Sequence, residues 1–193
     1  MLGRTVGTRF DDRFRLLSVL GQGAMGHVYE VSDEKLQGVR WALKELDLGV
    51  VLEKEKDEAI ALFKMAIKLK PDFDLAHNNL GIALVAEQKN EEAISHYKMA
   101  IKLKPDYADA HYNLGIALVA EGKNEEAISH YKMAIKIKPD YADAYNNLGA
   151  VLFNAKMTEE AIDYFKEAIR IRPGFAAAQK NLETALLRSE ELE

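Results

Sequence analysis

Every proline in the chain lies 34 residues after the one before it, and this spacing limits the possible folds more than any other feature. In this register, residues 74–107 and 108–141 differ at only five positions, and residues 142–175 follow with more changes. A repeat of this length is one supersecondary unit that must stack on a neighbour to bury its apolar face. The sequence therefore predicts a solenoid of 34-residue units, marked by Pro71, Pro105, Pro139 and Pro173.

Each unit contains two helical patterns separated by a short polar segment. In residues 108–141 the first helix is expected to end near Gly122, and Asn124 is expected to cap the second helix. Glu125 and Glu126 add negative charge where the second helix begins, which the helix dipole favours. Because proline disfavours helical geometry in the residue before it, each proline should end a second helix. The units are therefore predicted to be antiparallel helix pairs.

These units resemble the tetratricopeptide repeat family. The resemblance rests on small, apolar and aromatic residues that recur with the period: Leu80, Gly81, Ala93, Tyr97, Ala100, Leu114, Gly115, Ala127, Tyr131, Ala134, Leu148, Gly149, Ala161, Phe165 and Ala168. It covers about residues 56–193 and implies a mainly α solenoid of helix-turn-helix repeats. The predicted parts are a junction with a leading helix, three full repeats and a polar capping helix: 47–73, 74–107, 108–141, 142–175 and 176–193.

Residues 1–46 have a different pattern. Alternating apolar residues predict a small antiparallel sheet of three strands, near residues 13–20, 27–31 and 39–46. The stretch GQGAMGHVYEV lies between two of these strands, and WALKEL forms the last. This order resembles the start of a bacterial serine/threonine protein kinase, which implies nucleotide contacts through Gly21, Gly23, Gly26, Val28, Ala42 and Lys44.

The rest of the kinase machinery is missing from the sequence. Phosphoryl transfer needs a catalytic base and ligands for magnesium, but no H-R-D, D-F-G or A-P-E motif occurs. Residues 1–46 are therefore expected to be a kinase-like remnant without activity. Two roles stay open for it: a small structural sheet whose glycines serve the turn, or residual ATP binding.

Composition excludes several other classes. A net charge of −5 disfavours a nucleic-acid binder, and the absence of cysteine excludes disulfides and thiolate zinc sites. No segment has the length of a membrane span, so a cytoplasmic protein without membrane contact is expected. The histidines recur one repeat apart and are expected to serve packing or the surface, with no metal site and no cofactor.

In the family, the first helices of the repeats line a concave groove. The resemblance implies that asparagines in this groove hold an extended peptide backbone while neighbouring side chains contact its apolar anchors. The residues predicted to do so are Asn78, Asn79, Ile82, Tyr112, Asn113, Ile116, Asn146, Asn147, Phe153 and Asn181. Asparagine, tyrosine and isoleucine stand where a clamp for a carboxyl-terminal carboxylate needs lysine and arginine, so that class of ligand is not expected.

The sequence thus favours a non-catalytic scaffold or adaptor that binds a protein or an extended peptide. Two alternatives remain: a nucleotide-binding regulator built from a kinase remnant and repeats, and a recombined junction without joint function. The sequence does not predict the partner or the oligomeric state.

Overall fold

The computed structural model describes the backbone of residues 9–10, 14–23, 26–33, 40–46 and 53–190, and the side chains of residues 60, 61 and 63–190. It divides the chain into two compact units, Met1–Glu55 and Lys56–Glu193.

The first unit contains an antiparallel sheet in the strand order β1-β2-β3-β4. The strands are β1 Arg9–Phe10, β2 Phe14–Gly23, β3 Gly26–Asp33 and β4 Arg40–Leu46. The short strand β1 was not predicted. The register places Gly21 opposite Val28, and Val28 opposite Lys44 on the other side. The side chains of the six residues predicted to contact a nucleotide lie outside the described residues, so those contacts stay a prediction.

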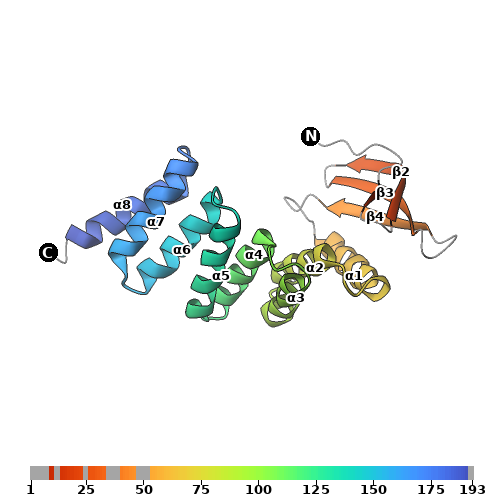
Figure 1. Cartoon of the computed structure of the whole chain (residues 1–193), viewed down its shortest axis with the longest axis horizontal. Helices are drawn as coiled ribbons and strands as arrows, with labels where there is room; N and C mark the ends of the chain where they lie inside the picture. The colour runs from red at the N-terminus through yellow and green to blue at the C-terminus, as the bar shows by residue number, and fades with distance from the viewer. Residues whose placement is uncertain (1–8, 11–13, 24–25, 34–39, 47–52, 191–193) are drawn as a thin grey trace. The chain divides into compact units, whose positions relative to one another are not determined.

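Eight α-helices follow in the described part of the chain, stacked in sequence along the array (Figure 1). Helices α2 and α3, α4 and α5, and α6 and α7 form the three helix pairs. The predicted mainly α solenoid is confirmed. The helices are α1 Glu53–Leu69, α2 Asp74–Ala86, α3 Asn90–Leu103, α4 Ala108–Ala120, α5 Asn124–Ile137, α6 Ala142–Asn154, α7 Thr158–Ile171 and α8 Ala176–Glu190.

The two helices of a repeat approach most closely where a glycine faces an aromatic ring. A Cβ added to Gly115 on α4 would lie 2.5 Å from Cε1 of Tyr131 on α5, far inside van der Waals contact. Gly149 faces Phe165 in the same way, at 2.7 Å from Cε1. Tyr131 and Phe165 are almost fully buried. The glycine is therefore required because the partner ring occupies the space of a side chain.

The turn inside each repeat needs one residue in the left-handed region. Gly122 adopts φ 71° there, and the equivalent Gln88 and Lys156 adopt 60° and 64°. Only glycine takes this conformation without a steric penalty. The predicted end of the first helix at Gly122 is thus confirmed, whereas the predicted cap is wrong. Helix α5 already begins at Asn124, and no side-chain hydrogen bond caps it.

The prolines follow the second helices as predicted. Helix α3 ends at Leu103, and Lys104, which precedes Pro105, is extended with φ −136° and ψ 91°. In each of these connections a cation lies over the ring of the aromatic residue three positions later, at 4.5 to 5.4 Å from its centroid. The pairs are Lys70 with Phe73, Lys104 with Tyr107, Lys138 with Tyr141 and Arg172 with Phe175.

A continuous core runs through the array from Ile60 on α1 to Ala185 on α8. Helix α8 buries only Ala178 and Ala185, and leaves Leu186 and Leu187 exposed. Among the described helices, none combines the length and the apolar character that crossing a membrane would need.

Candidate functional site

The first helices α2, α4, α6 and α8 are joined side by side by asparagines. Three of them, Asn113, Asn147 and Asn181, each donate a hydrogen bond from Nδ2 to a side-chain oxygen 35 residues earlier, on the preceding first helix. The three bonds, which we call the asparagine ladder, run from Asn113 to Asn78 Oδ1 at 3.1 Å, from Asn147 to Tyr112 Oη at 3.2 Å and from Asn181 to Asn146 Oδ1 at 2.9 Å.

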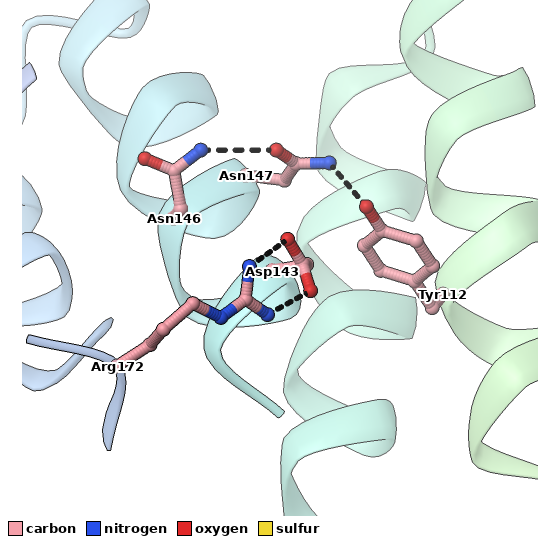
Figure 2. A network of polar contacts seen from close by, with 5 residues as sticks. All are labelled: Tyr112, Asp143, Asn146, Asn147 and Arg172. Carbon is pink, nitrogen blue, oxygen red and sulfur yellow. Dashed lines mark hydrogen bonds and ion pairs between the residues drawn. The ribbon is translucent and has the colours of Figure 1, made fainter. Parts of the chain in front are cut away.

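Two of the predicted groove residues are interior parts of this ladder. Asn78 and Asn146 are only 3% and 8% exposed. Asn146 accepts from Asn181 and donates from Nδ2 to Asn147 Oδ1 at 3.3 Å (Figure 2). Asn78 makes the equivalent pair of bonds, donating to Asn79. Both ends of these two amides are thus engaged, and their role in the structure is to hold neighbouring first helices together.

The half-buried asparagines keep hydrogen-bonding capacity. An amide side chain has two N–H donors and two acceptor lone pairs. Asn113 uses one N–H group, whereas Asn147 uses one lone pair and donates to the hydroxyl groups of both Tyr112 and Tyr131. Asn113 can therefore still offer a donor and an acceptor to the backbone of a bound peptide, and Asn147 can still offer an acceptor.

Apolar side chains lie beside the asparagines. Those that are half-buried and pack on the core are Ile82, Tyr112, Ile116 and Phe153. With Asn113 and Asn147 they define what we call the first-helix face. Arg188 of α8 covers one part of it, since its guanidinium lies 4.8 Å from the ring centroid of Phe153. This contact was not predicted, because the two residues are 35 positions apart in helices of different repeats.

Tyr112 is neutral at physiological pH and keeps its proton. Burial raises the pKa of its hydroxyl, with the Asp143 carboxylate as the second cause. Asn147 donates to the hydroxyl oxygen, so the O–H group itself stays available as a donor. The ring of Tyr141 lies 4.8 Å away, between centroids. Tyr112 can therefore serve a ligand both as an aromatic surface and as a hydrogen-bond donor.

An ion pair borders the same face. Arg172 donates to both carboxylate oxygens of Asp143, with Nη1 3.1 Å from Oδ1 and Nη2 2.5 Å from Oδ2 (Figure 2). Neither residue was predicted as part of the site. A signal was present, because an aspartate occupies the second position of two repeats, at Asp109 and Asp143, and a cation follows 29 residues later.

Four histidines form two pairs within repeats. His111 Nδ1 lies 3.0 Å from His130 Nδ1, and His77 Nδ1 lies at the same distance from His96 Nδ1. Within the described residues, no three histidine or carboxylate side chains come together in a way that could hold a metal ion. Each pair joins the two helices of its own repeat.

Models of known protein families match the repeats. A TPR repeat model matches residues 82–120 and 117–155, and a tetratricopeptide repeat model matches residues 142–175. No curated protein gave a significant match.

Several solved structures are similar. A crystal structure of MamA protein is 30% identical with a TM-score of 0.64, covering 68% of this chain and 72% of that one. Another crystal structure of MamA is 27% identical with a TM-score of 0.61, covering 72% and 91%. The first TPR of Spaghetti (RPAP3), solved with the HSP90 peptide SRMEEVD, is 22% identical with a TM-score of 0.60, covering 61% and 93%. This chain belongs to the tetratricopeptide repeat family.

Proposed function

We propose that this protein is a non-catalytic scaffold or adaptor that holds an extended segment of a partner protein on its first-helix face. The observation that carries the proposal is the placement of Asn113 and Asn147. Both are half-buried next to apolar side chains, both keep a free acceptor site after making the ladder, and Asn113 also keeps a free N–H group. An extended backbone presents N–H and C=O groups that such amides can bind irrespective of its side chains.

One similar structure supports a peptide as the ligand. The first TPR of Spaghetti (RPAP3) shares the fold and was solved with a bound peptide. For this chain the half-buried Tyr112, Ile116 and Phe153 supply apolar contacts on successive first helices. Burial of peptide side chains there would provide the main favourable free energy, and the asparagines would fix the register of the backbone.

The test is peptide selection followed by calorimetry. A displayed library of random peptides is selected on the full chain, and the best peptide is measured against the variant Asn113→Ala/Asn147→Ala. At about 0.5 to 1.5 kcal/mol per hydrogen bond, we expect roughly tenfold weaker binding. A matched control is Lys102→Ala/Lys136→Ala, which changes exposed residues on the second helices α3 and α5.

Because Asn113 and Asn147 also form the ladder, the folding of the double variant is measured together with its peptide binding. Removing Asn113 and Asn147 also removes two bonds between first helices, and a lower melting temperature is expected. Binding is therefore compared at a temperature where circular dichroism shows both proteins folded. Unchanged affinity in the folded double variant would contradict the proposal, as would an equal loss in the lysine control.

A second candidate function concerns the sheet. The register aligns Gly21, Val28 and Lys44 across three neighbouring strands, as a nucleotide site of the kinase type would require. Under this reading residues 1–46 bind ATP and regulate the repeats. Calorimetry with Mg-ATP checks it: binding that disappears in Lys44→Ala would support the regulator, and no binding would leave a structural sheet or a recombined junction.

A further inference from the structure

The first helices α2, α4 and α6 have an unusual charge pattern. They contain Asp74, Asp109 and Asp143 and not one lysine or arginine. The lysines of the repeats lie instead in the turns and on the second helices, where Lys98 and Lys132 pair with glutamates of the next repeat. A ligand on the first-helix face therefore meets carboxylates rather than cations along these three helices.

Asp143 shows how a cation binds at this position of a repeat. Arg172 approaches it side-on and donates to both oxygens, which is the geometry that a planar guanidinium forms best. Its carboxylate is thus already neutralised from within the chain.

Asp109 stands at the equivalent position one repeat earlier and has no such partner. It is exposed, and within the described residues no lysine or arginine forms an ion pair with it. Lys138, which corresponds to Arg172, lies over the ring of Tyr141 at 4.5 Å, as Arg172 lies over Phe175, but it does not also pair with the aspartate. The carboxylate of Asp109 therefore meets only a neutral phenol, whereas the equivalent carboxylate in the next repeat is paired with an arginine.

The surroundings of Asp109 suit a flat cation. The rings of Tyr112 and Tyr141 contact each other beside it, with centroids 4.8 Å apart. Burial raises the pKa of Tyr141, and Asp109 raises it further through its charge and by accepting a hydrogen bond from the phenol, so the phenol stays neutral and the carboxylate keeps further acceptor sites. A guanidinium can pair with a carboxylate while its flat face lies against an aromatic ring. An ammonium group can pair with the carboxylate, but it has no flat face to stack on the ring.

We propose that Asp109, with the ring of Tyr112, binds an arginine side chain of the partner peptide. The ligand is then a peptide with a basic residue among apolar ones. An acidic peptide of the type bound by the first TPR of Spaghetti (RPAP3) would place like charges together at this point. This inference rests on the proposed function and specifies the ligand of the same surface.

The experiment compares three displayed peptide libraries that differ only in a fixed central residue: arginine, glutamine or glutamate. On the full chain we expect arginine peptides to be enriched roughly 3- to 10-fold over glutamine peptides, and glutamate peptides to be depleted. In the variant Asp109→Asn the preference for arginine should disappear while glutamine peptides bind as before. Asp163→Asn, which changes an exposed aspartate on the second helix α7, is the matched control and should leave all three enrichments unchanged.

Two further results decide the proposal. Asp109→Arg should reverse the preference in favour of glutamate, and Lys138→Gln should strengthen arginine binding because it removes a neighbouring cation. Equal enrichment of the three libraries, or an equal loss of all three in Asp109→Asn, would overturn the arginine site but leave the peptide-binding function intact. Failure of every library to yield a binder would overturn the proposed function itself.

Discussion

The second and third repeats have the same backbone and different side chains. Helices α4 and α6 begin 34 residues apart, as do α5 and α7, and the buried glycine, alanine and aromatic positions recur in both. The polar positions differ. His111 pairs with His130 in the second repeat, whereas Tyr145 and Tyr164 take these positions in the third. The comparison indicates that a few small and apolar residues determine the fold, and that the neighbouring positions are free to differ in chemistry.

The largest effect should come from a change at the position that both repeats share. Gly115→Ala puts a methyl group where Tyr131 already lies, and overpacking of this kind costs about 1 to 3 kcal/mol. Gly149→Ala should cost a similar amount against Phe165. Urea unfolding of the two variants measures both. A loss of stability in only one of the two variants would contradict the claim that both repeats depend on the same close packing.

Acid should weaken the second repeat more than the third. His111 Nε2 lies 3.2 Å from the carbonyl oxygen of Pro105, to which it donates, so its Nδ1 is the acceptor for the Nδ1–H of His130. A proton added to His111 Nδ1 would put two N–H groups face to face. Burial lowers the pKa of His111, with the Pro105 hydrogen bond as an opposing cause, and burial also lowers the pKa of His130, with His111 next. Both fall below the ordinary 6.5.

The sign of the pH effect follows from these shifts. Below about pH 6.5 the unfolded chain binds protons that the folded chain resists, so the free energy of unfolding falls as the pH drops through this range. Above that pH the contribution is fully present. Lys98 and Glu126 also face His130, lowering and raising its pKa respectively. His96 in the first repeat should behave alike, because burial and then His77 and Lys64 lower its pKa, while Glu92 raises it.

The measurement is the melting temperature between pH 7.5 and 5. The variant His111→Tyr/His130→Tyr copies the tyrosine pair of the third repeat, so its melting temperature should depend less on pH. Hydrogen exchange should show earlier opening of α4 and α5 than of α6 and α7 in acid. Identical slopes for the variant and the unchanged chain would show that the histidine pair does not carry the effect.

A smaller effect is expected at the turns, where the two repeats differ. Lys156→Gly should stabilise the third repeat, because lysine there holds φ 64°, and Gly122→Lys should destabilise the second. Each change should be about 1 kcal/mol in the free energy of unfolding, with opposite sign. Chemical denaturation of the two variants checks this. Changes of the same sign would mean that side-chain contacts, and not backbone conformation, determine the effect of these residues on stability.

Much of the fold could be predicted because its determinants are local and periodic. The repeat length follows from the proline spacing, and the ends of the second helices follow from the prolines themselves. The cap at Asn124 could not, since the helix begins one residue earlier than the pattern suggested.

The contacts within the site were harder to predict. The rows of asparagines were evident, but the burial of Asn78 and Asn146 depends on how closely successive first helices approach. Arg172 and Lys138 both lie over an aromatic ring, but Arg172 also pairs with Asp143, and this difference depends on side-chain rotamers that no periodicity specifies.

The central claim is that the first-helix face, and not the second-helix face, binds a partner segment. The most direct measurement is nuclear magnetic resonance of the labelled chain during titration with the best selected peptide. We predict shifts of the side-chain amides of Asn113 and Asn147 and of the methyl groups of Ile116. The methyl groups of Met99 and Met133, exposed on the second helices α3 and α5, should not shift. Shifts of these methionines with unchanged Asn113, Asn147 and Ile116 would contradict the account.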